Sequence, residues 1–212
     1  MRCAVVAATC SGCAFTDIDV AFPEPTPKPS NVGYGREIVL RLPLADTREI
    51  NHRCGMKKNG WNLDTADVIC TEPPAPWFGY AVGEELRARG FLVTLGGYSA
   101  SLEPLVIEGS VQKLFVEPVL GFFVTTIETD FQVGLVASSP SGLIAERRFF
   151  IKGTETVFIA LDRDFQDSLD DAARKMVDAV ASGIVQLMDQ YPTLGRVPQQ
   201  RLAVHSGSSQ QR

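Results

Sequence analysis

The sequence has few of the residues and motifs that enzymes and metal proteins commonly use. Only two histidines occur in 212 residues, His52 and His205, and there is no Walker loop, no His-Glu-x-x-His and no nucleophile elbow. Asp162 and Asp164 lack the glycine and the closing glutamate of a calcium-binding loop. We expect a protein that is not an enzyme, with no cofactor, no metal site and His52 in a solvated loop. Acid–base chemistry by scattered carboxylates is the open alternative.

Two further absences limit the partners of the chain. The formal net charge is −5 at pH 7, which argues against nucleic acid because nucleic-acid-binding domains have a clustered basic surface. No apolar run approaches the roughly 18–20 residues that span a bilayer. The hydrophobic content of 45% is ordinary for a globular domain, and the length suits one domain with a real core.

The first thirteen residues have the composition of a secretory signal. One positive charge, Arg2, precedes an apolar segment, and two small residues, Ser11 and Gly12, stand directly before Cys13. This arrangement resembles the lipobox of bacterial lipoproteins. The resemblance implies that residues 1–12 are a signal peptide, that Cys13 becomes the mature N-terminus, and that it carries a lipid such as palmitate. It also implies attachment to the cell outer membrane, with the domain facing the periplasm.

The same residues allow two other interpretations. Cys10-Ser11-Gly12-Cys13 has the spacing of a redox Cys-x-x-Cys, which would make the chain a cytosolic redox or zinc protein. That motif needs a helix that opens at the cysteines, and a proline-rich segment soon after it leaves little room for one. Alternatively, residues 1–9 form an ordinary buried strand.

Residues 13–36 are predicted to be a tether between the lipid and the domain. Proline occupies every second position from Pro23 to Pro29. Because proline fixes φ and removes a backbone donor, this stretch favours extended polyproline II structure and a semi-rigid spacer. A ligand for a proline-binding groove is the alternative.

The remaining cysteines are predicted to form a disulfide. If Cys3 and Cys10 leave with the signal and Cys13 takes the lipid, Cys54 and Cys70 are left as a pair in an oxidising compartment. A closed loop of about fifteen residues is worth roughly 3 kcal/mol through the unfolded state. Two unpaired buried cysteines are the alternative. A zinc site that combines both cysteine pairs lacks the short knuckle spacing in its second half.

We expect residues 37–191 to form a single α+β domain, followed by a disordered polar tail over residues 192–212. Apolar stripes at helical spacing predict two helices, near residues 76–89 and 168–190, packed on one face of a sheet. Alternation with one polar face predicts a mostly antiparallel sheet of four to six strands. The main candidate strands are residues 37–44, 91–95, 105–117, 122–137 and 143–152.

Three local features refine this picture. Glu85 and Arg89 are four residues apart on the apolar side of the first helix, and we expect a snorkelling surface pair, with a buried functional pair as the alternative. Gly90 is predicted to end that helix, and Ser168 to cap the second one. Residues 97–101 match a nucleophile elbow only in part and are expected to be a plain loop.

Two short motifs resemble a known family. A first strand that ends in Asp46-Thr47-Arg48, followed by a Lys57-Lys58-Asn59-Gly60 loop and then a helix and strand, resembles YajG-type lipoproteins. Their relatives include the auxiliary lipoproteins of ABC transporters. The resemblance covers roughly residues 37–190 and offers no catalytic signature. It implies a protein partner in the cell envelope, and the cysteines that bound the loop are not part of its pattern.

Together these patterns predict a lipid-anchored envelope module that faces the periplasm and binds a partner protein or assists a transport system. It would meet the membrane only through the lipid on Cys13. The alternative is a carrier or scaffold for small apolar ligands, with a groove between the sheet and a helix. A cytosolic redox or zinc protein is the second alternative.

Overall fold

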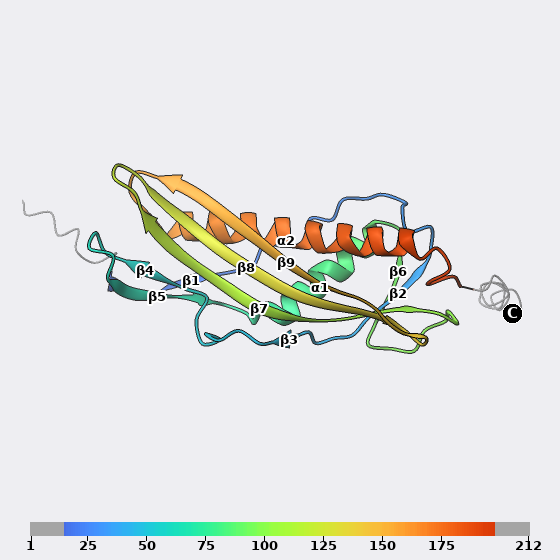
Figure 1. Cartoon of the computed structure of the whole chain (residues 1–212). Helices are drawn as coiled ribbons and strands as arrows, with labels where there is room; N and C mark the ends of the chain where they lie inside the picture. The colour runs from blue at the N-terminus through green and yellow to red at the C-terminus, as the bar shows by residue number, and fades with distance from the viewer. Residues whose placement is uncertain (1–14, 198–212) are drawn as a thin grey trace, which may run out of the picture.

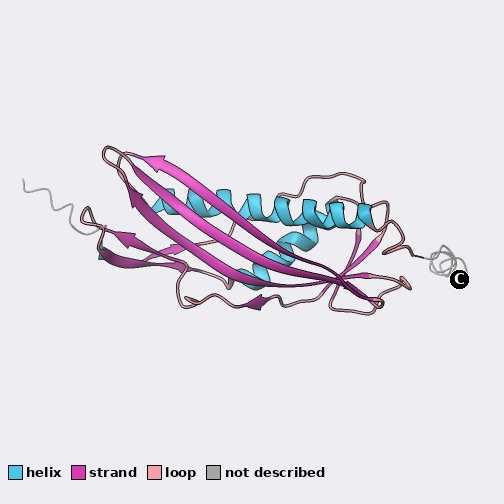
Figure 2. Cartoon of the chain, in the orientation of Figure 1, coloured by secondary structure: helices cyan, strands magenta, loops and turns pink. Residues whose placement is uncertain are grey.

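The computed structural model describes residues 15–197, so Cys13 and the signal-like residues before it lie outside the described part of the chain. The molecule is elongated, with a long twisted sheet along one side and two helices along the other (Figure 1). Both helices pack on the same face of the sheet, as the sequence predicted (Figure 2). The fold class is therefore α+β.

Nine strands within residues 15–197 form one mixed sheet. Three of them are long and antiparallel, and the others are short and extend one edge. They are β1 (Ile18–Val20), β2 (Glu37–Leu40), β3 (Ala45–Asp46), β4 (Gly55–Lys58), β5 (Asp64–Cys70), β6 (Leu92–Leu95), β7 (Leu105–Leu120), β8 (Thr125–Ser139) and β9 (Gly142–Val157). β8 lies between β7 and β9, and the other edge of β7 pairs in turn with β2, β3 and β4. β6 adds to β2, while β5 and then β1 add to β4.

The expected sheet of four to six mostly antiparallel strands was wrong in size and in strand direction. β2, β3 and β4 run parallel to β7, and β1 runs parallel to β5. Four strands were missed: β1, β3, β4 and β5. The first three have 3, 2 and 4 residues, which is too short for an alternation to be recognised, and the 7 residues of β5 were assigned to the loop between Cys54 and Cys70. β2 was expected to have one wet face, but all of its residues are buried because it lies between parallel neighbours.

The two helices are α1 (Pro74–Ala88) and α2 (Asp162–Gln190). Gly90 follows α1 with a φ of 86°, the left-handed conformation expected of a residue that ends a helix there. α2 begins before the predicted cap Ser168, and the Asp164 carboxylate accepts a hydrogen bond from the Leu161 N–H (2.7 Å) at its start. Aspartates in the first turn favour this earlier start because they interact with the positive end of the helix dipole.

The core lies between the sheet and the helices. Phe78 of α1 meets Phe131 of β8 edge to face, with ring centroids 5.5 Å apart, and both side chains are fully buried. Ser168, inside α2, is buried against β8, and its hydroxyl lies 2.8 Å from that of Thr129. β9 approaches α2 closely at Gly153, where a Cβ atom would lie 2.2 Å from the Ser168 carbonyl oxygen. A larger residue at Gly153 would therefore push the helix off the sheet.

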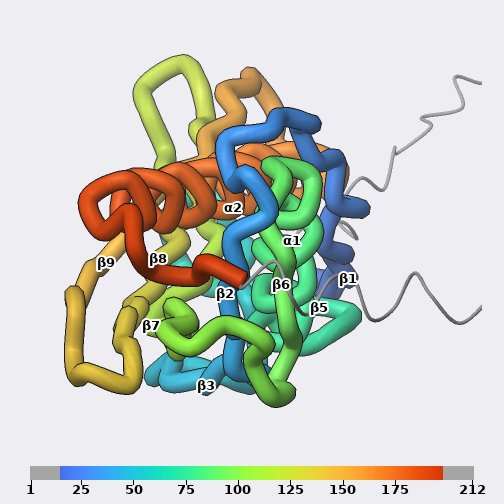
Figure 3. The backbone as a smooth tube through the Cα atoms, turned by 90° about the vertical axis from the view of Figure 1, so that its right-hand side faces the viewer, coloured from blue at the N-terminus to red at the C-terminus, as the bar shows by residue number. Residues whose placement is uncertain are grey.

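The described part of the predicted tether lies against the domain. β1 joins the sheet, and the Phe22 ring stacks on Trp77 at a centroid distance of 4.4 Å. The Trp77 indole also donates a hydrogen bond to the Pro23 carbonyl (3.2 Å). Figure 3 shows this segment, in blue, running beside both helices. The signal for it in the sequence is the alternation of Ile18, Val20 and Phe22, all three of which are buried.

The first residues of the predicted tail also pack on the domain. Leu194 is buried, and the Gly195 N–H donates to the Glu103 carbonyl (2.8 Å) while the Gly195 carbonyl accepts from the Glu37 N–H (2.7 Å). The predicted disorder of residues 198–212 concerns residues outside the described part of the chain.

Candidate functional site

A disulfide closes the base of the hairpin formed by β4 and β5. Cys54 and Cys70 are joined with a Cα–Cα distance of 5.6 Å, which is the pairing expected from the sequence. The backbone around Cys54 is fixed on both sides, since its N–H donates to Val68 (2.7 Å) and its carbonyl accepts from Val116 (2.8 Å). The disulfide therefore ties the hairpin at its base, next to β7.

The turn of this hairpin is a loop of residues 59–63. The Asn59 side chain accepts hydrogen bonds from the N–H groups of Trp61 (2.9 Å) and Leu63 (3.1 Å), which is how asparagine stabilises such turns. Positive φ occurs at Asn62 and not at Asn59 or Gly60. The loop presents Trp61 to solvent.

The Asp46-Thr47-Arg48 motif packs against the disulfide. Arg48 is only 8% exposed, and its guanidinium binds both carboxylate oxygens of Asp46 (2.9 and 2.8 Å). The remaining N–H groups face the carbonyls of Asn51 and Arg53 and the sulfur of Cys54 (3.2, 3.4 and 3.6 Å). Hydrogen bonding from Arg48, opposed by burial, holds the pKa of Asp46 below its ordinary value.

These contacts give Arg48 a structural role. A guanidinium has five N–H donors, and each of them has an acceptor in this cluster. The open depression beside the cluster has a volume of about 220 Å³ and includes His52, which is exposed in its loop as expected. Arg48 has no donor left for a ligand in that depression, so the motif fixes the loop over residues 49–53 and does not form a binding site.

The two lysines of the Lys57-Lys58-Asn59-Gly60 motif join the hairpin to its surroundings. Lys57 reaches Asp162 at the start of α2 (2.9 Å) and the Thr16 carbonyl (3.3 Å). Lys58 pairs with Glu117 of β7 at 2.5 Å. Both motifs that carry the family resemblance are therefore involved in holding the hairpin in place.

The face of the sheet that the helices leave uncovered is the best candidate for a binding surface. Lys113 of β7 pairs with Asp130 of β8 (2.6 Å), and Lys152 of β9 pairs with both Glu128 and Asp130. Hydrogen bonding from Lys152 to Glu128 raises the pKa of Lys152. Phe150, more than half exposed, lies beside this network. The surface thus combines a ladder of opposite charges with one aromatic side chain.

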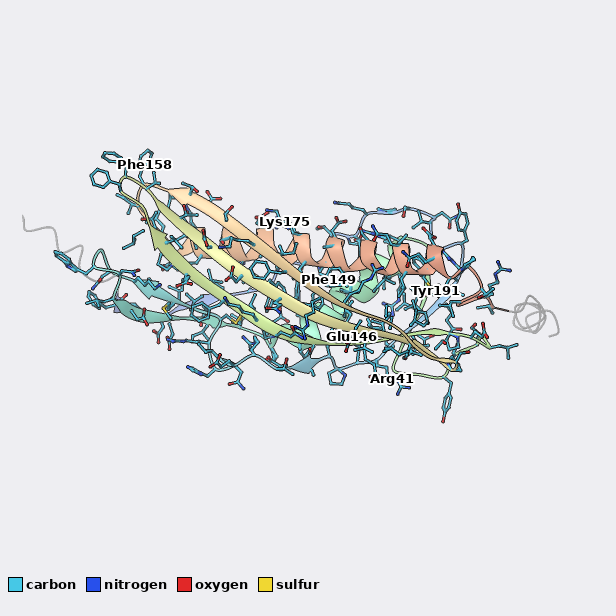
Figure 4. The ribbon with its side chains drawn as sticks, in the orientation of Figure 1. Arg41, Glu146, Phe149, Phe158, Lys175 and Tyr191 are labelled. Carbon is cyan, nitrogen blue, oxygen red and sulfur yellow. A yellow bond between two sulfur atoms is a disulfide. The ribbon has the colours of Figure 1, made fainter. Side chains whose placement is uncertain are left out.

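The same face is hollowed toward the other end of the strands. An open depression of about 600 Å³ runs across β7, β8 and β9. Gly109 and Gly134 lie in it without side chains, and Glu146 and Arg148 lie beside them on β9. Figure 4 labels Glu146 on this face. Phe149, three residues further along β9, packs against Gly183 of α2 on the other face. A shallow polar surface of this kind suits a protein partner better than a small ligand.

The predicted surface pair of Glu85 and Arg89 was wrong, because the Glu85 side chain is buried and the Arg89 side chain is largely covered between the helices. Arg89 binds Glu85 (2.8 Å) and crosses to α2, where it binds Asp178 (2.7 Å) and the Ser182 hydroxyl (2.9 Å). The Lys28 N–H donates to the second Glu85 oxygen (3.1 Å), so the proline-rich segment takes part as well. A chain segment and a second helix cover this side of α1, and the sequence of α1 alone does not reveal them.

The cavity beside Glu85 and Arg89 tests the alternative that the protein carries small apolar ligands. It has a volume of about 130 Å³ and lies under residues 23–28, between Trp77 and Val177. Pockets for drug-sized ligands have volumes of roughly 300–1,000 Å³. The cavity is too small for a lipid, and fully buried side chains such as Phe131 and Met176 fill the space between the sheet and the helices.

One buried carboxylate was missed from the sequence. Glu37 of β2 is 3% exposed and accepts hydrogen bonds from the Ser99 hydroxyl (2.8 Å) and the N–H groups of Ala100 (2.9 Å) and Ser101 (2.7 Å). Burial raises its pKa, but these bonds and one from Thr94 outweigh burial, so the net pKa lies below the ordinary value. Residues 97–101 are thus a loop that is ordered by Glu37, as its serines could have suggested.

The other predicted site residues are placed as follows. Cys13, the expected lipidation site, lies outside the described residues, as does Cys10. Within residues 15–197, no group of three or more His, Cys, Asp or Glu side chains could hold a metal ion. Cys54 and Cys70 are bonded to each other, so the zinc site that would combine them with Cys10 and Cys13 requires the disulfide to be reduced.

Comparison with known proteins supports the fold alone. No protein-family model matches the sequence, and no curated protein matches it. Protein XCC0632 from Xanthomonas campestris, of family DUF330, has a similar structure with a TM-score of 0.58 and 9% identity, over 82% of this chain and 99% of that one. A neuraminyllactose-binding hemagglutinin homolog from Helicobacter pylori matches with a TM-score of 0.41 and 12% identity, over 80% and 95% of the two chains. PelC from Paraburkholderia phytofirmans matches with a TM-score of 0.33 and 15% identity, over 70% and 93%.

Proposed function

We propose that the chain is a cell-envelope lipoprotein whose domain faces the periplasm and binds a partner protein without catalysing a reaction. A lipid on Cys13 would anchor it in the outer membrane. The observation that carries the proposal is the disulfide between Cys54 and Cys70, because disulfides persist in oxidising compartments and are rare in the cytosol. The resemblance to YajG-type lipoproteins and to auxiliary lipoproteins of ABC transporters is part of this proposal and suggests a transport system as the partner.

The uncovered face of the sheet supports the binding part of the proposal. It offers charges of both signs, an exposed aromatic ring at Phe150 and a shallow depression, which are the usual components of a protein-binding surface. No helix in residues 15–197 is long and apolar enough to cross a membrane. The proposal therefore assigns attachment to Cys13 and recognition to the sheet.

Metabolic labelling tests the anchor. Cells that express the full chain with a labelled fatty acid should yield labelled protein in the outer-membrane fraction. A Cys13→Ala variant should lose the label, and a Cys54→Ser, Cys70→Ser variant should keep it. Label that persists in Cys13→Ala, or its absence from the unaltered chain, would rule out lipid attachment at Cys13.

Site-specific photo-cross-linking tests the recognition surface. A photo-reactive residue at Phe150, on the uncovered face, should give a discrete cross-link to an envelope protein. The matched control is Lys175, which is exposed on α2 at the opposite side of the molecule. Equal products from both positions, or none from Phe150, would refute a partner site on the sheet.

A further inference from the structure

Four segments that are distant in the sequence meet at one end of the molecule. The turn between β7 and β8 lies beside residues 158–161, because Thr125 pairs with Val157. β4 runs parallel to β7, so the loop of residues 59–63 reaches the same end. Lys57 donates a hydrogen bond to the Thr16 carbonyl, so Phe15, the preceding residue, lies near the same hairpin. We call residues 59–63, 119–124 and 158–161, together with Phe15, the apolar tip.

The apolar tip is made of large hydrophobic side chains without charge. The stretches 59–63, 118–127 and 156–161 contain no Asp, Glu, Lys or Arg. Phe122 is 92% exposed, Trp61 85% and Phe158 83%. Figure 4 shows Phe158 projecting from this end, away from the body of the protein. The remaining exposed members of the tip are Phe15, Leu63, Val119, Leu120, Phe123, Ile159 and Leu161.

Packing within the described residues does not explain why hydrophobic side chains occupy these exposed positions. Phe122 and Phe123 meet edge to face with centroids 4.6 Å apart, yet Phe123 also remains largely exposed. Single exposed hydrophobic residues are normal on protein surfaces, but several exposed aromatic residues gathered at one end of the molecule mark an interaction site. The tip projects as separate loops and does not form a groove. This shape suits insertion into a membrane and does not suit the enclosure of a ligand.

The position of Phe15, where the described chain begins, identifies the membrane as the surface that the tip meets, and this step rests on the proposed lipidation of Cys13. Phe15 lies in the tip, and two residues of extended chain span at most about 7 Å. A lipid on Cys13 would therefore enter the bilayer at the same end of the molecule as Phe122 and Phe158. The described segment after Phe15 packs on the domain, so it does not act as a spacer that holds the tip away from the membrane.

We infer that the apolar tip inserts its aromatic side chains into the interfacial region of the bilayer and forms a second membrane contact beside the lipid. Burial of apolar surface drives the insertion, and the indole of Trp61 suits the boundary between lipid and water. The nearby lysines, Lys57 and Lys58, are both paired with carboxylates. Binding therefore requires neither anionic lipid nor low salt, in contrast to polybasic membrane-binding segments.

Vesicle co-sedimentation of the unlipidated full chain tests the inference apart from the anchor. The chain with Cys13→Ala should bind vesicles of phosphatidylcholine, and its partition coefficient should be nearly the same at 50 and 500 mM salt. The double substitution Phe122→Ser, Phe158→Ser in that background should lower the coefficient by about tenfold or more. The matched control is Tyr98→Ser, Leu143→Ser, which removes exposed residues from the opposite end. The control should bind as well as its parent.

Each other outcome overturns the inference. No binding by the Cys13→Ala chain, or equal binding by tip and control variants, would show that the tip does not contact the membrane. Sedimentation velocity without vesicles detects the competing occupant, a second copy of the chain. Self-association that the tip substitutions abolish, without vesicle binding, would make the tip a protein interface. Circular dichroism should show all variants folded, and failure of fatty-acid labelling would remove the anchor without affecting these results.

Discussion

The two ends of the long strands differ sharply in how their loops are stabilised. The turn between β8 and β9 is Ser139-Pro140-Ser141-Gly142, and nearby Glu37 orders residues 97–101. At the opposite end, the turn between β7 and β8 is Gly121-Phe122-Phe123-Val124, with both rings in solvent. α2 runs alongside these strands and, with 29 residues, is about 44 Å long.

This difference separates residues that stabilise the fold from residues that are available for function. The loop around Ser99 is polar in sequence, but its polar groups are used internally by Glu37. The apolar tip is hydrophobic in sequence, but its side chains are not used in the core. An exposed aromatic turn on a well-packed sheet is therefore more informative about function than a polar loop.

Among changes at the two ends, removal of the disulfide should have the largest effect on the free energy of unfolding, because it loosens the hairpin that carries Trp61. The Cys54→Ser, Cys70→Ser variant should lose about 3 kcal/mol in its free energy of unfolding. Guanidinium denaturation of the oxidised chain and the variant measures the difference. A loss below about 1 kcal/mol would mean that the base of the hairpin is held mainly by other contacts.

At the polar end, Glu37→Gln should cost about 1–3 kcal/mol at pH 7, because an amide cannot accept every hydrogen bond that the carboxylate accepts. The matched control is Glu103→Gln, which changes an exposed carboxylate at the same end and should be near neutral. Chemical denaturation of both variants is the measurement. Equal effects would contradict a specific role for Glu37.

The stabilisation by Glu37 should also depend on pH. Its pKa is lower in the folded protein than the ordinary value of 4.5, so the contribution is fully present above pH 4.5 and is lost as pH falls through the folded pKa. The difference in stability between the parent and Glu37→Gln should therefore be constant from pH 6 to 8 and should shrink below pH 4.5. A difference that grows on acidification would contradict this sign.

At the apolar tip, Phe122→Ser should change the free energy of unfolding in solution by less than about 0.5 kcal/mol, because the ring is 92% exposed. The same substitution at buried Phe131 should cost at least about 3 kcal/mol. Thermal or chemical unfolding measures both variants. The change for Phe122→Ser is the smallest effect expected here, and Phe131→Ser is its internal reference. A large loss for Phe122→Ser would mean that the tip has a structural role.

Much of the fold could be predicted where periodic patterns are long. The stripe of α2 and the alternation of β8 extend over many residues, and two cysteines left in a domain expected to be exported are a direct reason to expect a disulfide. The short parallel strands could not be predicted, because β3 has only 2 residues and its partner β7 is more than 60 residues away.

The functional surfaces were harder to predict than the fold. Phe122 and Phe123 were read as the beginning of a strand, because sequence alone does not tell a buried aromatic residue from an exposed one in a turn. Glu37 is the first residue of the predicted strand 37–44, where nothing in the sequence marks it as buried, and its partners lie more than 50 residues away. In each case the deciding fact is which distant segments cover the residue.

Trp61 offers the most direct test of the contact between the apolar tip and the bilayer. The chain has two tryptophans, and Trp77 is buried against Phe22, so Trp61 is the one that faces the surroundings. With the Cys13→Ala chain, vesicles that contain brominated phosphatidylcholine should shift the emission to shorter wavelength and quench it. Trp61→Phe should abolish both changes. Emission that brominated lipid leaves unchanged, or quenching that survives in Trp61→Phe, would contradict insertion of the tip.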